Sequence, residues 1–375
     1  MNAFILSLSL FFFSFANFSI KASIISYLLL ILFHFKYPFK ENKIATTLLL
    51  TSLLLLAYLT IGLITSEKIQ LIYFLKFLLL FPYFFIFSNY VMIGRITLSY
   101  LDSIVKIYIL LHATIFSVQL ILYLVFGYYL DLNDLIREKD SNTAYLSKDM
   151  ADMLIPIRAT GMYSEPSFYA MAIFPALVYL YNRNIYLKYF LFGLATYLLS
   201  FSAAAFVVLF LWLTVQLFFQ KGYLKSKITI SVLLISAILV MGQFFITRAF
   251  ESSDYDSVNS RMRIVNELNE RSNLRNIFGS GYFLNELEGN GKTNITAAGI
   301  RDSGMHLSIF YSGGLIGFFL FLSLLLIFTK NIKITILILI SLLFKYGILL
   351  TSFWILLILL LVTIHNPNQD KVYRI

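Results

Sequence analysis

Apolar stretches of about 15 to 25 residues recur along almost the whole chain, and they constrain its fold more than any other feature. A helix of roughly 20 residues crosses about 30 Å of hydrocarbon, and it satisfies its own backbone polar groups there. The strands of a membrane barrel would alternate in polarity, which these stretches do not. We therefore predict an all-α polytopic membrane protein with about twelve transmembrane helices. The predicted spans are 3–20, 22–36, 44–64, 69–92, 104–129, 163–181, 185–200, 202–220, 227–248, 304–328, 331–347 and 349–365.

The composition agrees with this fold class. Hydrophobic residues make up 59% of the chain and charged residues 13%, and the mean hydropathy is +0.83. These values lie far outside the range of soluble domains. The net charge of +10 does not indicate nucleic-acid binding, because the basic residues are dispersed among short loops. We predict a single integral membrane domain over residues 1–375.

The distribution of Lys and Arg between alternate loops predicts the orientation of the chain. With the N-terminus inside, the even-numbered short loops and the C-terminus hold Lys36, Lys40, Lys43, Arg95, Lys106, Arg183, Lys188, Lys221, Lys225, Lys227, Lys330, Lys333, Lys371 and Arg374. The short loops on the other side hold Lys21, Lys68 and Lys345. Two long loops, 130–162 and 249–303, are therefore expected on the extracytoplasmic face.

The first long loop ends in a segment that suits anion binding. Pro166 lacks an N–H and has a fixed φ, so it is expected in the first turn of a helix, where Ser164 or Glu165 could accept hydrogen bonds from free N–H groups. Gly161 permits a sharp turn that would bring Arg158 over this helix start. A guanidinium and the positive end of the helix dipole would together favour an anionic group such as a phosphate.

Lys76, His112 and the small residues at 200–205 each have a structural interpretation. Lys76 and His112 are candidates for function because ionisable groups are rare in membranes, but a lysine can snorkel and a lone histidine can simply be packed and hydrogen-bonded. The short turn at 182–184 predicts a tight helical hairpin. Small residues at 200–205, where the hairpin ends, allow close helix approach.

The second long loop is predicted to contain an amphipathic helix on the membrane surface. Apolar residues at 258, 262, 265 and 268 form a helical stripe, and Ser257 or Ser260 could be its N-cap. Arg261 and Arg263 lie two positions apart in this helix and are expected to point to different sides.

The second loop closes on residues 301–306, and an apolar stretch with Gly313, Gly314 and Gly317 follows. His306 is therefore expected about one turn into a helix, at the outer face. Its position at the same face as the arginines of both long loops makes it a candidate for catalysis or ligand binding.

Four of these segments together resemble the O-antigen polymerase and O-antigen ligase superfamily of bacterial polysaccharide assembly. They are Arg158-x-x-Gly161-x-x-x-Glu165-Pro166, the serine-containing hairpin at 200–205, Ser260-Arg261 with the following amphipathic stretch and Gly279-x-Gly281, and His306 with Gly313-Gly314-x-x-Gly317. They occur in the family order within residues 155–320. The chain has Ala203 and Val265 where the family commonly has an arginine and an aromatic residue. The resemblance implies a GT-C-like glycosyltransferase architecture in the bacterial cytoplasmic (inner) membrane.

The resemblance implies transfer of a growing glycan from undecaprenyl diphosphate to the non-reducing end of a lipid-linked repeat unit. Arg158, Arg261 and Arg263 would bind the diphosphate and stabilise the charge that develops as it leaves. His306 would take the proton of the acceptor hydroxyl, since histidine exchanges a proton near neutral pH. Glu165 is the rival base, with helix capping as its structural alternative.

Further expected substrate contacts are Arg301, Tyr163 and Ser202. We expect an inverting transfer without a cofactor or metal. A metal-dependent route stays open because Asp254-Tyr255-Asp256 has a spacing that can hold a divalent cation.

The alternatives are a ligase that passes the glycan to another acceptor, a transporter of lipid-linked oligosaccharides, and a non-catalytic scaffold. A transporter should carry charges inside several spans, whereas here they concentrate in two loops. Expected partners are undecaprenyl-diphosphate-linked oligosaccharide and membrane lipid, with a flippase and a chain-length regulator implied by the resemblance.

Overall fold

The computed structural model describes residues 2–36, 45–65, 70–132, 158–219, 228, 231–232, 257–284, 289–290, 295–296, 299–300, 303–329 and 332–362. Apart from one pair of two-residue strands, the regular structure of these residues is helical. The helices before the first long loop are α1 (Asn2–Phe13), α2 (Ile20–Lys36), α3 (Thr46–Thr65), α4 (Leu71–Met92) and α5 (Leu98–Phe126). Those after it are α6 (Pro166–Arg183), α7 (Leu187–Leu199), α8 (Ala203–Phe219), α10 (Ser257–Glu270), α11 (Asn273–Phe278), α13 (Met305–Thr329), α14 (Ile332–Ser341) and α15 (Thr351–Val362).

Three of the described helices are long and apolar enough to cross a membrane, namely Leu71–Met92, Leu98–Phe126 and Met305–Ile327. Shorter apolar helices occupy most of the other predicted spans. The span predicted at 227–248 lies outside the described residues, apart from 228 and 231–232. The all-helical class is thus confirmed for the described part of the chain, and the number of spans stays a prediction.

By its internal contacts the chain divides into two compact units. The first unit comprises Met1–Leu53, Phe74–Ala205 and Ile348–Ile375, and the second comprises Leu54–Tyr73 and Phe206–Gly347. The single integral membrane domain expected from the sequence stays a prediction.

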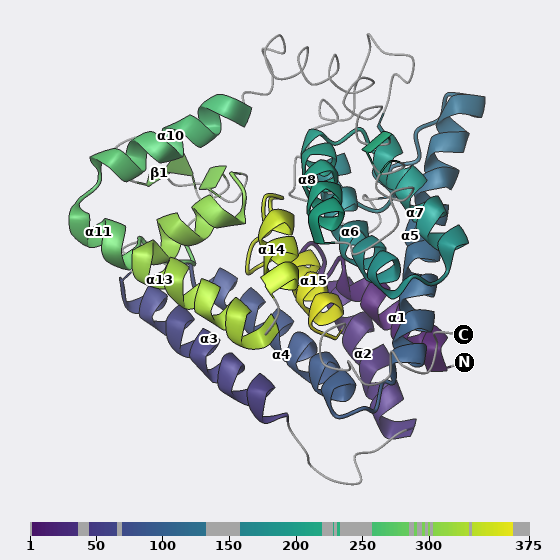
Figure 1. Cartoon of the computed structure of the whole chain (residues 1–375), viewed down its shortest axis with the longest axis horizontal. Coiled ribbons are helices and arrows are strands. Elements are labelled where there is room, and N and C mark those ends of the chain that lie inside the picture. Colours follow the sequence, from purple (N-terminus) through teal and green to yellow (C-terminus); the bar gives the residue numbers. More distant parts are fainter. Residues whose placement is uncertain are drawn as a thin grey trace. The chain divides into compact units, whose positions relative to one another are not determined.

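Helix α5 is the centre of the first unit. It contacts α1, α6 and α7, and its long path beside α6 and α7 can be followed in Figure 1. Thr97 starts it by accepting a hydrogen bond from the Tyr100 N–H, and Gly127 ends it in a left-handed conformation. Helix α6 also packs against α7 and α15, which confirms the predicted α6–α7 hairpin.

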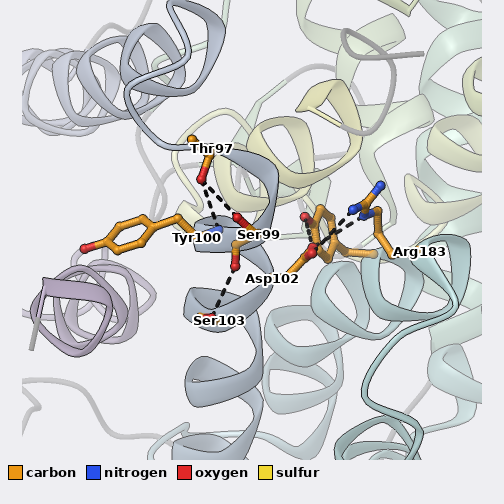
Figure 2. Close-up of polar contacts among 7 residues, drawn as sticks. Thr97, Ser99, Tyr100, Asp102, Ser103 and Arg183 are labelled. Atoms are coloured by element: carbon orange, nitrogen blue, oxygen red, sulfur yellow. Dashed lines mark hydrogen bonds and ion pairs between the residues drawn. The ribbon is translucent and has the colours of Figure 1, made fainter. Parts of the chain in front are cut away.

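An ion pair joins α5 and α6 near the start of α5. Figure 2 shows the Arg183 guanidinium directed at the Asp102 carboxylate, with Nη2 and Oδ2 3.4 Å apart. The Tyr179 hydroxyl donates to the same carboxylate at 2.6 Å. Because all three side chains come from the interface of the two helices, this cluster fixes their relative position.

Helix α13 organises the second unit. It contacts α10, α11 and α14, which lie around it in Figure 1. A small apolar cluster joins α10 and α13 to the chain between α11 and α13, and it consists of Ile264, Leu284, Ile300 and Tyr311, with Leu268 packed against it. The strands β1 (Gly289–Asn290) and β2 (Ile295–Thr296) pair antiparallel within the same loop region.

Helix α13 is broken at Gly314. This residue has φ 64° and ψ −166°, a conformation that interrupts the helix and that glycine adopts without a side-chain clash. The break interrupts the helical hydrogen-bond ladder, so carbonyl groups just before it need other partners.

Candidate active site

The segment that carries Arg158 is non-helical and buried in the first unit. Arg158 is 4% exposed, and Ala159 and Thr160 after it are fully enclosed. Gly161 follows with a φ of 61°, and the ring of Tyr169 lies against it. The turn predicted at this glycine is therefore confirmed.

Gln119 of α5 binds the backbone of this segment. Its Oε1 accepts hydrogen bonds from the N–H groups of Thr160 and Gly161, both at 2.8 Å. Its Nε2 donates to the carbonyl groups of Leu130 at 2.7 Å and Gly161 at 3.4 Å. Gln119 itself is completely buried. Sequence reasoning does not single it out, although an amide within a long apolar stretch is the signal that could find it.

Tyr163 is held inside the first unit by polar and ring contacts. Its hydroxyl donates to Ser14 Oγ at 3.0 Å, and its ring is stacked on His112 with centroids 5.8 Å apart. Ser14 Oγ also lies 3.4 Å from His112 Nε2. The structural interpretation of His112 as packed and hydrogen-bonded is confirmed, and Tyr163, the predicted substrate contact, lies in the same buried cluster.

Glu165 occupies the N-cap position of α6, and Pro166 is the first helical residue, as predicted. The Glu165 side chain makes no capping hydrogen bond. Its Oε2 instead accepts a hydrogen bond from the Ser167 hydroxyl at 3.0 Å. The expectation that this carboxylate binds the free N–H groups of the helix is therefore wrong, because Ser167 draws it to the side.

The α7–α8 connection buries the predicted substrate contact Ser202. Phe201 has a left-handed φ of 47°, which turns the chain sharply between the two helices. The Tyr197 hydroxyl closes the turn by donating to the Ala205 carbonyl at 2.6 Å. The chain thus turns tightly at 200–205, and the close helix approach predicted from the small residues stays a prediction.

His306 lies at the second position of α13 and is half-buried in the second unit. Its Nε2 is 2.7 Å from the Leu339 carbonyl oxygen. A carbonyl can only accept, so Nε2 carries the hydrogen and Nδ1 of the neutral ring is the nitrogen able to accept a proton.

The start of α13 is docked on the end of α14. The Met305 N–H donates to the Leu342 carbonyl at 3.1 Å, and Gly304, with φ 101°, packs against the Leu343 carbonyl. Leu339 belongs to the last turn of α14, where carbonyl groups lack helical partners. The same contact between the two helices therefore satisfies both helix ends and orients the His306 ring.

Helix α10 confirms the predicted helix in the second loop, and its place on the membrane surface stays a prediction. Among the described side chains of α10, at 262–270, Ile264 and Glu267 are buried, whereas Met262 is 51% and Val265 36% exposed. Met262 and Val265 of the predicted stripe are therefore exposed, whereas Leu268 packs against the apolar cluster of the second unit. Ser260 lies inside α10, so its expected role as N-cap is wrong.

Arg261 and Arg263 both lie in α10, two positions apart, on different sides of the helix. Arg263 is exposed. The side chain of Arg261 lies outside the described residues, as do Arg301, Asp254 and Asp256. Within the described ranges, no group of three or more His, Asp and Glu could hold a metal ion.

Arg271, just after α10, stabilises the break in α13 and is also missed by sequence reasoning. Its Nη1 donates to the Tyr311 carbonyl at 3.0 Å and its Nη2 to the Phe310 carbonyl at 3.3 Å. Its Nε donates to Asn276 Oδ1 at 2.6 Å. Burial lowers the pKa of the guanidinium, and the nearby Glu267 carboxylate opposes that shift.

The predicted site residues are divided between the two units. Arg158, Tyr163, Glu165 and Ser202 belong to the first, and Arg261, Arg263 and His306 to the second. Within the first unit, the first three lie in one short segment before α6. No protein-family model, no curated protein and no solved structure matches this chain.

Proposed function

We propose that this chain is a polysaccharide polymerase of the O-antigen or capsule type in the bacterial cytoplasmic membrane. It would transfer a growing glycan from undecaprenyl diphosphate to the non-reducing end of a lipid-linked repeat unit on the extracytoplasmic side. The three long apolar helices support a membrane location. The order of the Arg158, hairpin, Arg261 and His306 segments supports the enzyme class.

The orientation of the His306 ring is the observation that carries the proposal. The Leu339 carbonyl fixes the hydrogen on Nε2 and leaves Nδ1 as the proton acceptor. A general base needs such a fixed tautomer, because the wrong one presents an N–H to the acceptor hydroxyl. The half-buried ring also retains access to its surroundings.

The proposed step forms one glycosidic bond and breaks another. The acceptor hydroxyl oxygen attacks the anomeric carbon, and its proton passes to His306 Nδ1. The bond between that carbon and the diphosphate oxygen breaks, and its electron pair leaves with undecaprenyl diphosphate. Attack from the opposite face inverts the anomeric centre. The proton on His306 returns to solvent or to the leaving diphosphate after the transfer.

The leaving diphosphate needs cationic partners, and we assign this role to arginines. Arg158 is buried, so its guanidinium would interact with a phosphate in a medium that screens charge less than water does. Arg261 is the proposed second partner, and Arg263 would contact the anionic group from the exposed side of α10. Fixed guanidinium groups can stabilise the developing charge without a metal.

A polymerisation assay with purified protein, its lipid-linked repeat unit and EDTA tests the proposal. Wild type is compared with His306→Gln, Arg158→Lys and the control His34→Gln. His34 is also half-buried and bonded through one ring nitrogen, to the Tyr90 hydroxyl at 2.6 Å. We expect a product ladder from wild type and His34→Gln, and a loss of about 100-fold or more in His306→Gln.

Three results would contradict the proposal. Attachment of a single glycan to a different acceptor would identify a ligase. A requirement for added Mg²⁺ or Mn²⁺ would show that the transfer depends on a metal, with Asp254 and Asp256 as the candidate ligands. A full ladder from His306→Gln would remove the proposed base.

A further inference from the structure

The segment after Arg158 enters the first unit well below the end of α5. Gln119 lies seven residues before Phe126, the last residue of α5, which corresponds to about 10 Å along the helix axis. The N–H groups of Thr160 and Gly161 reach Gln119 at 2.8 Å. Non-helical backbone therefore lies at the depth of an apolar helix and not at its surface end.

Backbone at this depth needs polar partners from the protein. Irregular backbone within the hydrocarbon region occurs only where protein encloses it or where it faces a water-filled cavity. An amide side chain offers two acceptor sites and two N–H donors. Gln119 uses all four, in two bonds from Thr160 and Gly161 and two bonds to Leu130 and Gly161.

We infer that Gln119 is a positioning residue for Arg158. The inference rests on the proposed role of Arg158 at the diphosphate. Gln119 binds the N–H groups of Thr160 and Gly161, the second and third residues after Arg158. Gly161 has the left-handed φ that the turn of the chain at this point requires. A buried guanidinium on an anchored backbone keeps its place without the chain reorganising during the reaction.

Gln119 also binds the chain just after α5, through the Leu130 carbonyl. Leu130 follows α5, so its carbonyl brings the chain after that helix to the same amide that holds Thr160 and Gly161. The Tyr129 hydroxyl lies 3.1 Å from Thr160 Oγ1 and adds a contact between these two stretches. Gln119 thus connects both ends of the first long loop to α5.

The test compares Gln119→Met, which keeps the shape but loses all four hydrogen bonds, with Gln119→Glu, which keeps oxygen acceptors for both N–H groups. The control is Gln216→Leu, since Gln216 is also a buried amide in an apolar helix but belongs to the second unit. Initial rates of repeat-unit addition are measured against donor concentration in the wild-type and Arg158→Lys backgrounds.

We expect kcat of Gln119→Met to fall about 10- to 100-fold with KM changed much less, because misplacement of a transition-state contact lowers turnover. Gln119→Glu should recover most of this loss. In the Arg158→Lys background, Gln119→Met should cost at most about threefold, because coupled residues are not additive.

Equal losses in both backgrounds, or a kcat of Gln119→Met equal to that of Gln216→Leu, would overturn the inference. If Gln119→Met does not fold, Gln119→Glu decides. Gln119→Glu still loses the bonds donated to the Leu130 and Gly161 carbonyl groups, so its kcat should fall by about two- to fivefold. Disappearance of this fall in the Arg158→Lys background supports positioning, and an equal fall in both backgrounds or no fall in either contradicts it. If wild type forms no polymer, the proposed function fails, and this outcome differs from an active wild type with insensitive Gln119 variants.

Discussion

Two regions of the molecule have non-helical backbone among apolar helices, and the hydrogen bonds that their backbone groups need are supplied in opposite ways. The segment after Arg158 presents N–H groups, and the side-chain oxygen of Gln119 accepts from them. The break at Gly314 presents carbonyl groups, and the Arg271 guanidinium donates to them. Each irregular stretch thus depends on one buried polar side chain about 40 positions away in the sequence.

The glycines of the two regions are also required for different physical reasons. Gly161 is required for its left-handed φ, with only the Tyr169 ring nearby. Gly313 and Gly317 are required for space, because a Cβ on either would meet Tyr58 of α3. The first region therefore depends on backbone conformation, and the second depends on it at Gly314 and on close helix approach at Gly313 and Gly317.

Removal of the Arg271 side chain should have the largest effect on stability. Arg271→Met would leave the carbonyl groups of Phe310 and Tyr311 without these charged donors, at a cost of about 3 kcal/mol. The measurement is the thermal unfolding midpoint in detergent. Arg275→Met is the matched control because Arg275 is only partly buried. Equal midpoints for the two variants would show that the break does not depend on Arg271.

Gly317→Ala should be the next most damaging change. The added methyl group would overlap the Tyr58 ring, and overpacking of this kind costs about 1–3 kcal/mol. Unfolding midpoints in a double-mutant cycle with Tyr58→Leu measure the coupling. The cost of the alanine should shrink when Tyr58 is shortened, and an unchanged cost would mean that Tyr58 does not set the spacing.

Asp102→Asn should reduce stability by about 1 kcal/mol without lowering turnover, because the Asp102–Arg183 pair is partly exposed. Asp102 lies 17 positions before Gln119 on α5, about 25 Å along its axis. Parallel unfolding and repeat-unit addition assays check this separation. A large loss of turnover would show that the two ends of α5 are functionally coupled.

Gly161→Ala should reduce stability by about as much as Asp102→Asn, about 1 kcal/mol, since it forces alanine into a left-handed conformation. Turnover of Gly161→Ala should fall by more than its loss of stability explains, because the turn at Gly161 positions the segment that carries Arg158. Gly94→Ala is the control, because Gly94 also has a positive φ, of 76°, with open space around it. Identical turnover in the two variants would contradict the assigned role of the turn.

Hydropathy predicts most of the helices, because a long apolar stretch in a membrane has few alternatives to a helix. Their ends are less predictable. α5 begins at Leu98, six residues before the predicted start, because Thr97 caps it. α14 ends at Ser341, six residues before the predicted end, since residues 342 and 344 supply carbonyl groups to the start of α13.

The site is only partly readable from the sequence for a related reason. Pro166, Gly161 and His306 leave local signals of helix start, turn and helix position. Gln119 and Arg271 bind backbone groups that are distant in the sequence. The sequence around each of them gives no indication of which segment it binds. The contact of Ile264 in α10 with Leu284 and Tyr311 is likewise tertiary, and the stripe at 258, 262, 265 and 268 does not predict it.

The most direct test of glycosyl transfer is the number of undecaprenyl diphosphate molecules released for each glycosidic bond formed, measured in EDTA with purified protein. The proposed mechanism predicts one released carrier for each bond, with both products lost together in His306→Gln. Carrier release without bond formation, bond formation without release, or unchanged stoichiometric turnover in His306→Gln would contradict it.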